Sequence, residues 1–226
     1  MGNCFCYDYP SPIRDTFLPS NDNHISLLYH QHSEKLLPEL KDLYKTFSNS
    51  TFIGTQSISI SSTLQEENLD FFSRLLPECQ SLKTLKLINN SLGILGGKSL
   101  YSPLTELKSL EHLTISHNSL NDEGIEAICA SFSFIPKLKF LDFSFNDFSA
   151  VGGEKIAEAL IDLDLIESVL ISGNQLTRRT IEKIAKVLKG KEFLRKFEFD
   201  SEGVKESDLE KIKMLLPRIY ADDGLF

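Results

Sequence analysis

The chain has 226 residues, of which 41% are hydrophobic, and it carries a formal net charge of −8. A chain of this length can form one or two packed domains, and its acidic balance argues against general binding to nucleic acid. No apolar run reaches the roughly 18 residues of a membrane span, and no signal-peptide stretch follows the first residues. The four cysteines, which lack metal-binding spacing and are typical of a reduced, cytoplasmic compartment, are Cys4, Cys6, Cys79 and Cys129.

The first six residues, MGNCFC, carry a candidate lipid anchor. Gly2 occupies the position at which N-myristoylation occurs, although Cys6 stands where the usual pattern has Ser or Thr. Palmitate on Cys4 and Cys6 would provide the second chain that stable anchoring requires. Two interpretations remain open. Either Gly2, Cys4 and Cys6 are acylated and tether the protein to the cytoplasmic face of a membrane, or this is an ordinary chain start with two free thiols.

Two segments precede the repetitive part of the chain. Residues 1–23 are expected to be flexible, because residues 7–23 contain three prolines and several Asp and Asn residues. Residues 24–50 are expected to form a helical cap over the open end of the repeats. Its main helix is predicted over 33–47, where apolar residues share one face, and a shorter helical piece is expected around 25–29.

Residues 51–81 lie directly before regular repeats of 28 residues and are expected to be an irregular first repeat. Phe72 and Leu76 keep the register of the later repeats, but serines occupy the strand positions where leucines belong. Ile58 and Ile60 lie one position late, and a slip of one residue would turn the wrong face of a strand inward. We expect the loop over 61–63 to be one residue shorter and to absorb this offset.

Residues 82–221 contain five regular repeats, and residues 222–226 form a tail. The first apolar residue of each unit steps by 28, through Leu82, Leu110, Leu138, Ile166 and Leu194. Within a unit, apolar residues first alternate with polar ones and then recur four residues apart, as in Leu100 and Leu104. The first spacing predicts a short half-buried strand, and the second predicts a helix face. A fixed period of this size predicts a solenoid whose stacked units share one core.

Two further residue types recur at fixed positions. A glycine is found where the chain enters each helix, at Gly96, Gly124 and Gly152, but Thr180 and Asp208 replace it in the last units. An asparagine follows each strand, where backbone groups leave the sheet, and a stacked amide can hydrogen-bond such groups in neighbouring turns. Glu202 takes its place in the last unit, as expected for a capping repeat. The asparagines are Asn90, Asn118, Asn146 and Asn174.

The combined pattern LxxLxLxxNxLxxxGxxxLxxxL resembles the ribonuclease-inhibitor-like subfamily of leucine-rich repeat proteins. The resemblance covers residues 82–221 and implies an α/β leucine-rich repeat horseshoe, a right-handed solenoid with a concave parallel sheet and convex helices. Members serve mainly as binding surfaces for other proteins, which suggests an intracellular scaffold or adaptor. Some relatives activate GTPases through an arginine or asparagine in a loop near the first repeats. The alternative is therefore a GTPase regulator resembling Ran GTPase-activating proteins, but the N-terminal half offers only Arg14 and Arg74 for that role.

Strand residues that alternate with the buried leucines must face the concave side. Most of these residues are small and polar, but some are aromatic, aliphatic or charged, and exposed anchors of that kind are typical of protein interfaces. An alternative for Phe145 is that its ring folds back into the turn as packing. The predicted protein-binding residues are Lys86, Ile88, His112, His117, Phe140, Asp142, Phe145, Leu170 and Lys196.

Three other patterns carry weaker signals. Residues 93–99 approximate a phosphate-binding loop, but Leu92 stands where its first glycine is required. His112, His117 and Asp142 share a polar sheet face, where such groupings arise by chance. Residues 178–196 contain eight basic and two acidic residues, which form either a solvated helix face or a contact for an acidic partner or an anionic membrane. We therefore expect no enzymatic activity, cofactor, metal ion, small-molecule substrate or nucleic-acid partner.

Overall fold

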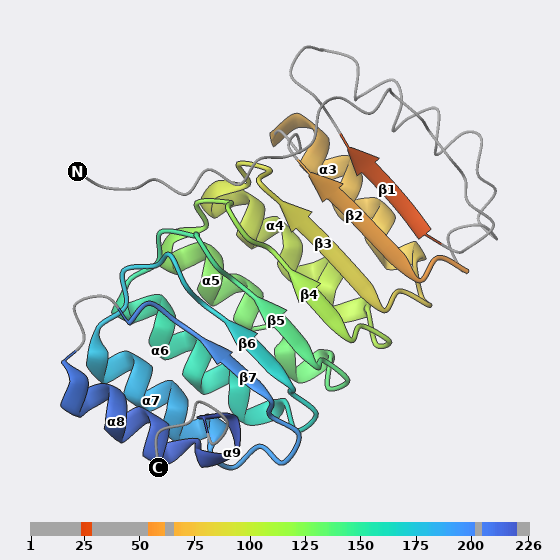
Figure 1. Ribbon diagram of the computed structural model, residues 1–226. Helices are drawn as coiled ribbons and strands as arrows, with labels where there is room; N and C mark the ends of the chain where they lie inside the picture. The colour runs from red at the N-terminus through yellow and green to blue at the C-terminus, as the bar shows by residue number, and fades with distance from the viewer. Residues whose placement is uncertain (1–23, 29–53, 62–65, 202–204, 221–226) are drawn as a thin grey trace.

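The computed structural model describes residues 24–28, 54–61, 66–201 and 205–220. Within these residues, parallel strands lie side by side in chain order and form one sheet (Figure 1). The strands are β1 (His24–Leu28), β2 (Ser57–Ser61), β3 (Thr84–Ile88), β4 (His112–Thr114), β5 (Phe140–Asp142), β6 (Ser168–Leu170) and β7 (Lys196–Glu198).

A helix follows each strand from β2 onward and covers the same side of the sheet (Figure 1). We call the opposite side, which no described helix covers, the concave face. The predicted α/β solenoid, with a concave parallel sheet and convex helices, is confirmed. The helices are α3 (Glu66–Leu75), α4 (Gly93–Glu106), α5 (Asn121–Cys129), α6 (Ala150–Ala159), α7 (Arg178–Leu188), α8 (Glu206–Leu215) and α9 (Pro217–Tyr220), with the 3-10 turns η1 (Leu76–Glu78), η2 (Phe132–Phe134) and η3 (Leu160–Asp162).

One hydrophobic core runs through the repeats between the sheet and the helices. Burying an aliphatic side chain contributes roughly 1.5–3 kcal/mol, and in a solenoid the cover comes from the neighbouring units. A single repeat would leave these side chains exposed to solvent and would therefore lose this stabilisation. The strand positions that pair across the sheet at the 28-residue step are all buried, namely Leu85, Leu113, Leu141, Val169 and Phe197. The matching helix positions are buried as well, namely Leu100, Ile128, Ile156, Ile184 and Ile212.

The asparagine after each strand forms the hydrogen-bonded ladder that its register predicts. Oδ1 of Asn118 accepts from the backbone N–H of Asn90 at 2.9 Å, and Oδ1 of Asn146 accepts from that of Asn118 at 3.1 Å. Nδ2 of Asn146 donates to the carbonyl oxygen of Ile115, one repeat back, at 2.6 Å. These three amides are buried. They supply the partners that turn backbone groups lose when the chain leaves the sheet.

The N-terminal segment differs from its prediction. Residues 24–28 were expected to begin a helical cap, but they form strand β1, which pairs in parallel with β2 and places Ile25 beside Ile58. The physical reason is that Ile25 and Leu27 alternate with polar residues, a period that suits a strand, and the edge of β2 offers unpaired backbone groups. The helix predicted over 33–47 lies outside the described residues and stays a prediction.

The irregular first repeat recovers the common register through its strand. Ile58 is buried and lies beside Leu85, a step of 27 residues, since 85 − 58 = 27. Phe72 and Leu100, which are buried on the helix side, keep the step of 28. The missing residue therefore falls between β2 and Phe72, in a stretch that includes residues outside the described part of the chain.

Candidate protein-binding face

The predicted binding residues all have side chains at least partly open to solvent. Five of them are exposed, namely Lys86, His112, His117, Phe145 and Lys196. Four are half-buried, namely Ile88, Phe140, Asp142 and Leu170. They come from β3 to β7 and from the turns that directly follow β4 and β5. The solenoid therefore gathers on one face residues that are up to 110 positions apart, since 196 − 86 = 110.

Two aromatic pairs stand on this face, each joining the repeat of β4 to the repeat of β5. His112 and Phe140 are paired strand residues whose ring centroids lie 6.0 Å apart at an interplanar angle of 31°. His117 and Phe145 occupy the turns after the same strands, and their rings stack at 4.3 Å and 10°. Aromatic pairs of this geometry contribute about 0.5–1.5 kcal/mol beyond the burial of their area. The face thus presents two pre-arranged aromatic anchors.

Phe145 is held away from the core, contrary to the alternative in which it serves as packing. Its side chain is 49% exposed, whereas Phe143, two residues earlier, is fully buried. Its backbone has φ of 57°, a left-handed conformation that is unusual for a bulky residue. One side of its ring stacks on His117, and a Cβ atom added at Gly173 would come within 2.2 Å of the ring. The absence of a side chain at Gly173 therefore makes room for Phe145.

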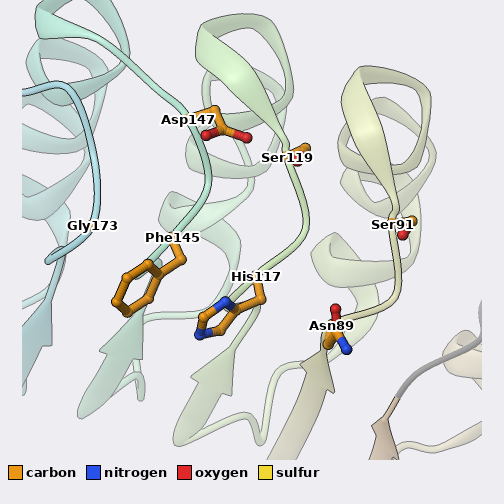
Figure 2. Close-up of a pocket in the computed structure, with 7 residues that line it drawn as sticks. All are labelled: Asn89, Ser91, His117, Ser119, Phe145, Asp147 and Gly173. Carbon is orange, nitrogen blue, oxygen red and sulfur yellow. The ribbon is translucent and has the colours of Figure 1, made fainter. Parts of the chain in front are cut away.

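An open hollow of about 310 Å³ lies at the carboxyl ends of the strands (Figure 2). The sequence prediction missed its second row of side chains, Ser91, Ser119 and Asp147. A signal for this row exists, because these residues follow the ladder asparagines at the same 28-residue step and all have positive φ. The residues that line the hollow are Asn89, Ser91, His117, Ser119, Phe145, Asp147 and Gly173.

At the opposite rim, which the amino ends of the strands form, charged side chains of neighbouring repeats pair with one another. Residues 111, 139, 167 and 195 are Glu, Lys, Glu and Arg, so the sign alternates from repeat to repeat. Lys139 Nζ lies 2.7 Å from Glu111 Oε2, and Arg195 Nε lies 3.9 Å from Glu167 Oε2. The hydrogen bond from Lys139 lowers the pKa of Glu111 and raises that of Lys139 itself. Both acidic residues of this row are therefore paired within the chain, whereas Lys83, which occupies the same position one repeat earlier, takes part in no ion pair among the described residues.

The structure gives little support to the phosphate-binding loop, the GTPase-regulator alternative or a basic contact surface. Residues 93–99 form the first turns of α4 rather than a loop, and Lys98 pairs with Glu123 on α5. Arg74, which the GTPase-regulator alternative would need in a loop, lies in the last turn of α3. Of the eight basic residues in 178–196, six are in ion pairs within the chain: Arg178, Lys183, Lys186, Lys191, Arg195 and Lys196. The pairs of Arg178, Lys183 and Lys186, which lie on α7, favour a solvated convex face.

The two cysteines in the described part of the chain do not contribute to this face. Cys79 and Cys129 are buried thiols. Burial raises the pKa of Cys79 to about 12 and also raises that of Cys129, so neither is a reactive thiolate. Gly2, Cys4 and Cys6 lie outside the described residues, and their acylation stays a prediction. Among the helices described, none combines the length and the apolar character that crossing a bilayer requires. The described residues hold no cluster of three metal-binding side chains.

Comparisons with known proteins agree with this fold. Residues 106–129 and 135–157 match the family model described as Leucine Rich repeat. No curated protein matches the chain. The chain is similar to the solved structure of leiomodin-1 actin-binding site 2, with a TM-score of 0.54 and 16% identity over 72% of this chain and 93% of that chain. It is also similar to the tropomodulin C-terminal domain of Caenorhabditis elegans, with a TM-score of 0.58 and 13% identity over 68% of this chain and 94% of that chain.

Proposed function

We propose that this leucine-rich repeat protein is a non-enzymatic scaffold or adaptor that binds another protein on its concave face. The observation that carries the proposal is the pair of aromatic anchors, His112 with Phe140 and His117 with Phe145, which stand on a sheet face that no described helix covers. Interface hot spots are enriched in aromatic residues at the centre of a patch with a polar rim. Here Lys86 and Lys196 flank the anchors.

The repeat pattern further supports membership of the ribonuclease-inhibitor-like subfamily, whose members act mainly through such surfaces. We also propose a cytoplasmic location, and a tether at a membrane through Gly2, Cys4 and Cys6. The support for both is confined to the sequence, namely the MGNCFC start and the scarcity of cysteine elsewhere in the chain. The tether would raise the local concentration of the concave face near a membrane-bound partner.

Site-specific crosslinking tests the proposed face. A photoreactive phenylalanine analogue at position 140 should crosslink to a partner protein, and the same analogue at position 134 should not. Phe134 is a matched control because its side chain is 43% exposed but belongs to η2, away from the strands. Replacement of Phe140 and Phe145 by alanine should weaken binding by about 2–4 kcal/mol if both are hot spots. Loss of binding on replacement of Lys183 and Lys186 alone would instead place the site on the convex helices.

Purified actin is the first defined partner to test, because one of the similar structures is an actin-binding site of leiomodin-1. Sedimentation with filaments and retention of monomers on immobilised protein would each detect such binding. Binding that is unaffected by the Phe140 and Phe145 replacements would contradict the proposed face even if actin proved to be a partner.

A further inference from the structure

The residues before the ladder asparagines occupy the same position in successive turns, and two of them are stacked rings. Asn89, His117, Phe145 and Gly173 occupy this position, and their φ angles are 56°, 57°, 57° and 72°. Gly173 closes one side of the Phe145 ring, and His117 closes the other at 4.3 Å. The far side of the His117 ring is turned toward Asn89, the smaller side chain of the preceding repeat (Figure 2). The stack therefore ends in a ring whose outer surface lines the hollow.

The turn itself does not require an aromatic ring at this position, because Asn89 and Gly173 occupy it in other repeats with similar φ angles. A left-handed backbone conformation is unfavourable for residues with a Cβ atom, and bulky side chains are rare there. Phe145 adopts it and still leaves 49% of its side chain in solvent. Strain of this kind persists where the surrounding structure imposes it and where exposure of the side chain has a use. Both rings line the hollow, so a ligand bound in the hollow would contact them.

The second row of the hollow, away from the rings, carries a negative charge (Figure 2). Asp147, in the second row of the hollow, is exposed and takes part in no ion pair among the described residues. Asp200 is also exposed and accepts from the backbone N–H of Gly173 at 2.6 Å, at the same end of the stack. The acidic residues of the row at the opposite rim, by contrast, are paired within the chain. The hollow thus combines aromatic surface with a carboxylate that lacks a cation.

We propose that this hollow binds an arginine side chain from the partner protein. The methylene stem of arginine can lie on the ring surface of the His117–Phe145 pair, and its planar, cationic guanidinium group can donate to Asp147 in the second row. One side chain can meet both rows because arginine is long, and the Ser91 and Ser119 hydroxyls are further acceptors in the same hollow. A phosphate or nucleotide would meet the carboxylate with the wrong charge. This inference rests on the proposed function, and it specifies that the partner protein presents an exposed arginine side chain at the interface.

The test uses the full-length protein and three small probes. N-acetylarginine methylamide is titrated while the ring protons of His117 and Phe145 are followed by NMR. The matched probes carry citrulline, which is planar but uncharged, or lysine, which is charged but not planar. We expect saturable ring shifts with the arginine probe and at least fivefold weaker binding of the other two. Equal binding of citrulline or lysine, or no saturable shift with arginine, would overturn the assignment.

Matched variants complete the test. His117→Asn removes the ring but keeps a residue type that tolerates positive φ, and Asp147→Asn removes only the charge. Both should weaken binding of the arginine probe at least fivefold, whereas Asp162→Asn, an exposed carboxylate in η3, should leave it unchanged. An unchanged affinity in either hollow variant, or an equal loss in Asp162→Asn, would overturn the inference. Crosslinking from position 140 that persists without arginine binding would refute this inference alone; absence of both would refute the proposed function as well.

Discussion

Asn146 illustrates how much of this fold depends on single side chains that bury polar groups. Its Oδ1 accepts from the backbone N–H of Asn118, and its Nδ2 donates to the carbonyl oxygens of Ile115 and Phe143. Replacement by alanine leaves the N–H of Asn118 and the carbonyl oxygen of Ile115 without these partners, whereas the carbonyl oxygen of Phe143 keeps a hydrogen bond from Asn174 Nδ2. Each such group costs about 1–3 kcal/mol, so the free energy of unfolding should fall by at least that amount.

Urea denaturation of Asn146→Ala measures the loss. Gln175→Ala is the matched control, because Gln175 is an exposed amide in the corresponding turn of the next repeat. Equal midpoints for the two variants would show that the buried ladder does not stabilise the turns.

Phe145 is a residue at which a substitution should weaken partner binding without a large change in the free energy of unfolding. Phe145→Asn loses a stacked pair of about 0.5–1.5 kcal/mol but places at φ of 57° a residue that avoids the cost of roughly 1–2 kcal/mol for a left-handed conformation. The two terms offset, so the free energy of unfolding should change by less than about 1 kcal/mol, while partner binding weakens.

Phe143→Ala provides the contrast for that measurement. Its ring is fully buried two residues away, so its removal should cost about 3–5 kcal/mol. A comparable loss of stability in Phe145→Asn would mean that the exposed ring is structural after all.

At the scale of elements, the contact between α4 and α5 depends on the absence of a side chain. A Cβ atom at Gly97 would lie 2.5 Å from the Cα of Gly124, and backbone cannot move aside as a flexible side chain can. Gly97→Ala should therefore push the helices apart and cost about 1–3 kcal/mol. Thermal unfolding compares it with Gly190→Ala, where the nearest atom would lie at 3.7 Å. Similar melting temperatures for both variants would contradict the close contact.

Helix α8 is joined to its neighbour α7 through a carboxylate. Asp208 on α8 is buried and lies 2.7 Å from Arg178 Nη1 on α7 and 3.0 Å from Lys211 Nζ. Hydrogen bonds from Lys211 and Arg178 lower the pKa of Asp208 below its ordinary value. A lowered pKa in the folded state stabilises the protein above the pKa of the unfolded state, about 3.9, and this contribution is lost as pH falls further.

Urea denaturation at pH 7, 5 and 3 measures that contribution. Wild type should be more stable than Asp208→Asn at pH 7 and 5, and the difference should shrink at pH 3, which lies below the pKa of the unfolded state, so that unfolding is then favoured by proton uptake at Asp208. A difference that stays constant across the three pH values would show that Asp208 acts without its charge.

At the scale of the whole molecule, we predict that Gly2 is myristoylated and that Cys4 and Cys6 are palmitoylated. Gly2→Ala should then move the protein to the soluble fraction of cells. Cys4→Ser with Cys6→Ser should leave weak, reversible membrane binding, because one myristoyl chain binds only marginally. Cells fed a clickable myristate analogue provide the readout. An unlabelled wild-type protein in the soluble fraction would refute the tether.

The sequence by itself determined the repeat, the buried face of each strand and the asparagine ladder, because a solenoid repeats local rules at a fixed step. Leu113, Leu141 and Val169 are buried as that step requires. The prediction was wrong for the segment that precedes the 28-residue repeats. The short segment at 25–29 was expected to be helical, and only the edge of β2 decided that residues 24–28 form a strand.

Only the tertiary structure decided how the exposed side chains are arranged. The sequence indicates that His117 and Phe145 lie on neighbouring repeats, but their stacking depends on positive φ angles and on the space at Gly173. The hollow forms only when the turns of four successive repeats lie side by side. The 28-residue step does not predict which rim of the sheet keeps a charged side chain without an ion pair. Burial acts on every residue of a repeat and leaves a pattern, whereas a binding site depends on a few side chains whose positions are fixed only when the repeats stack.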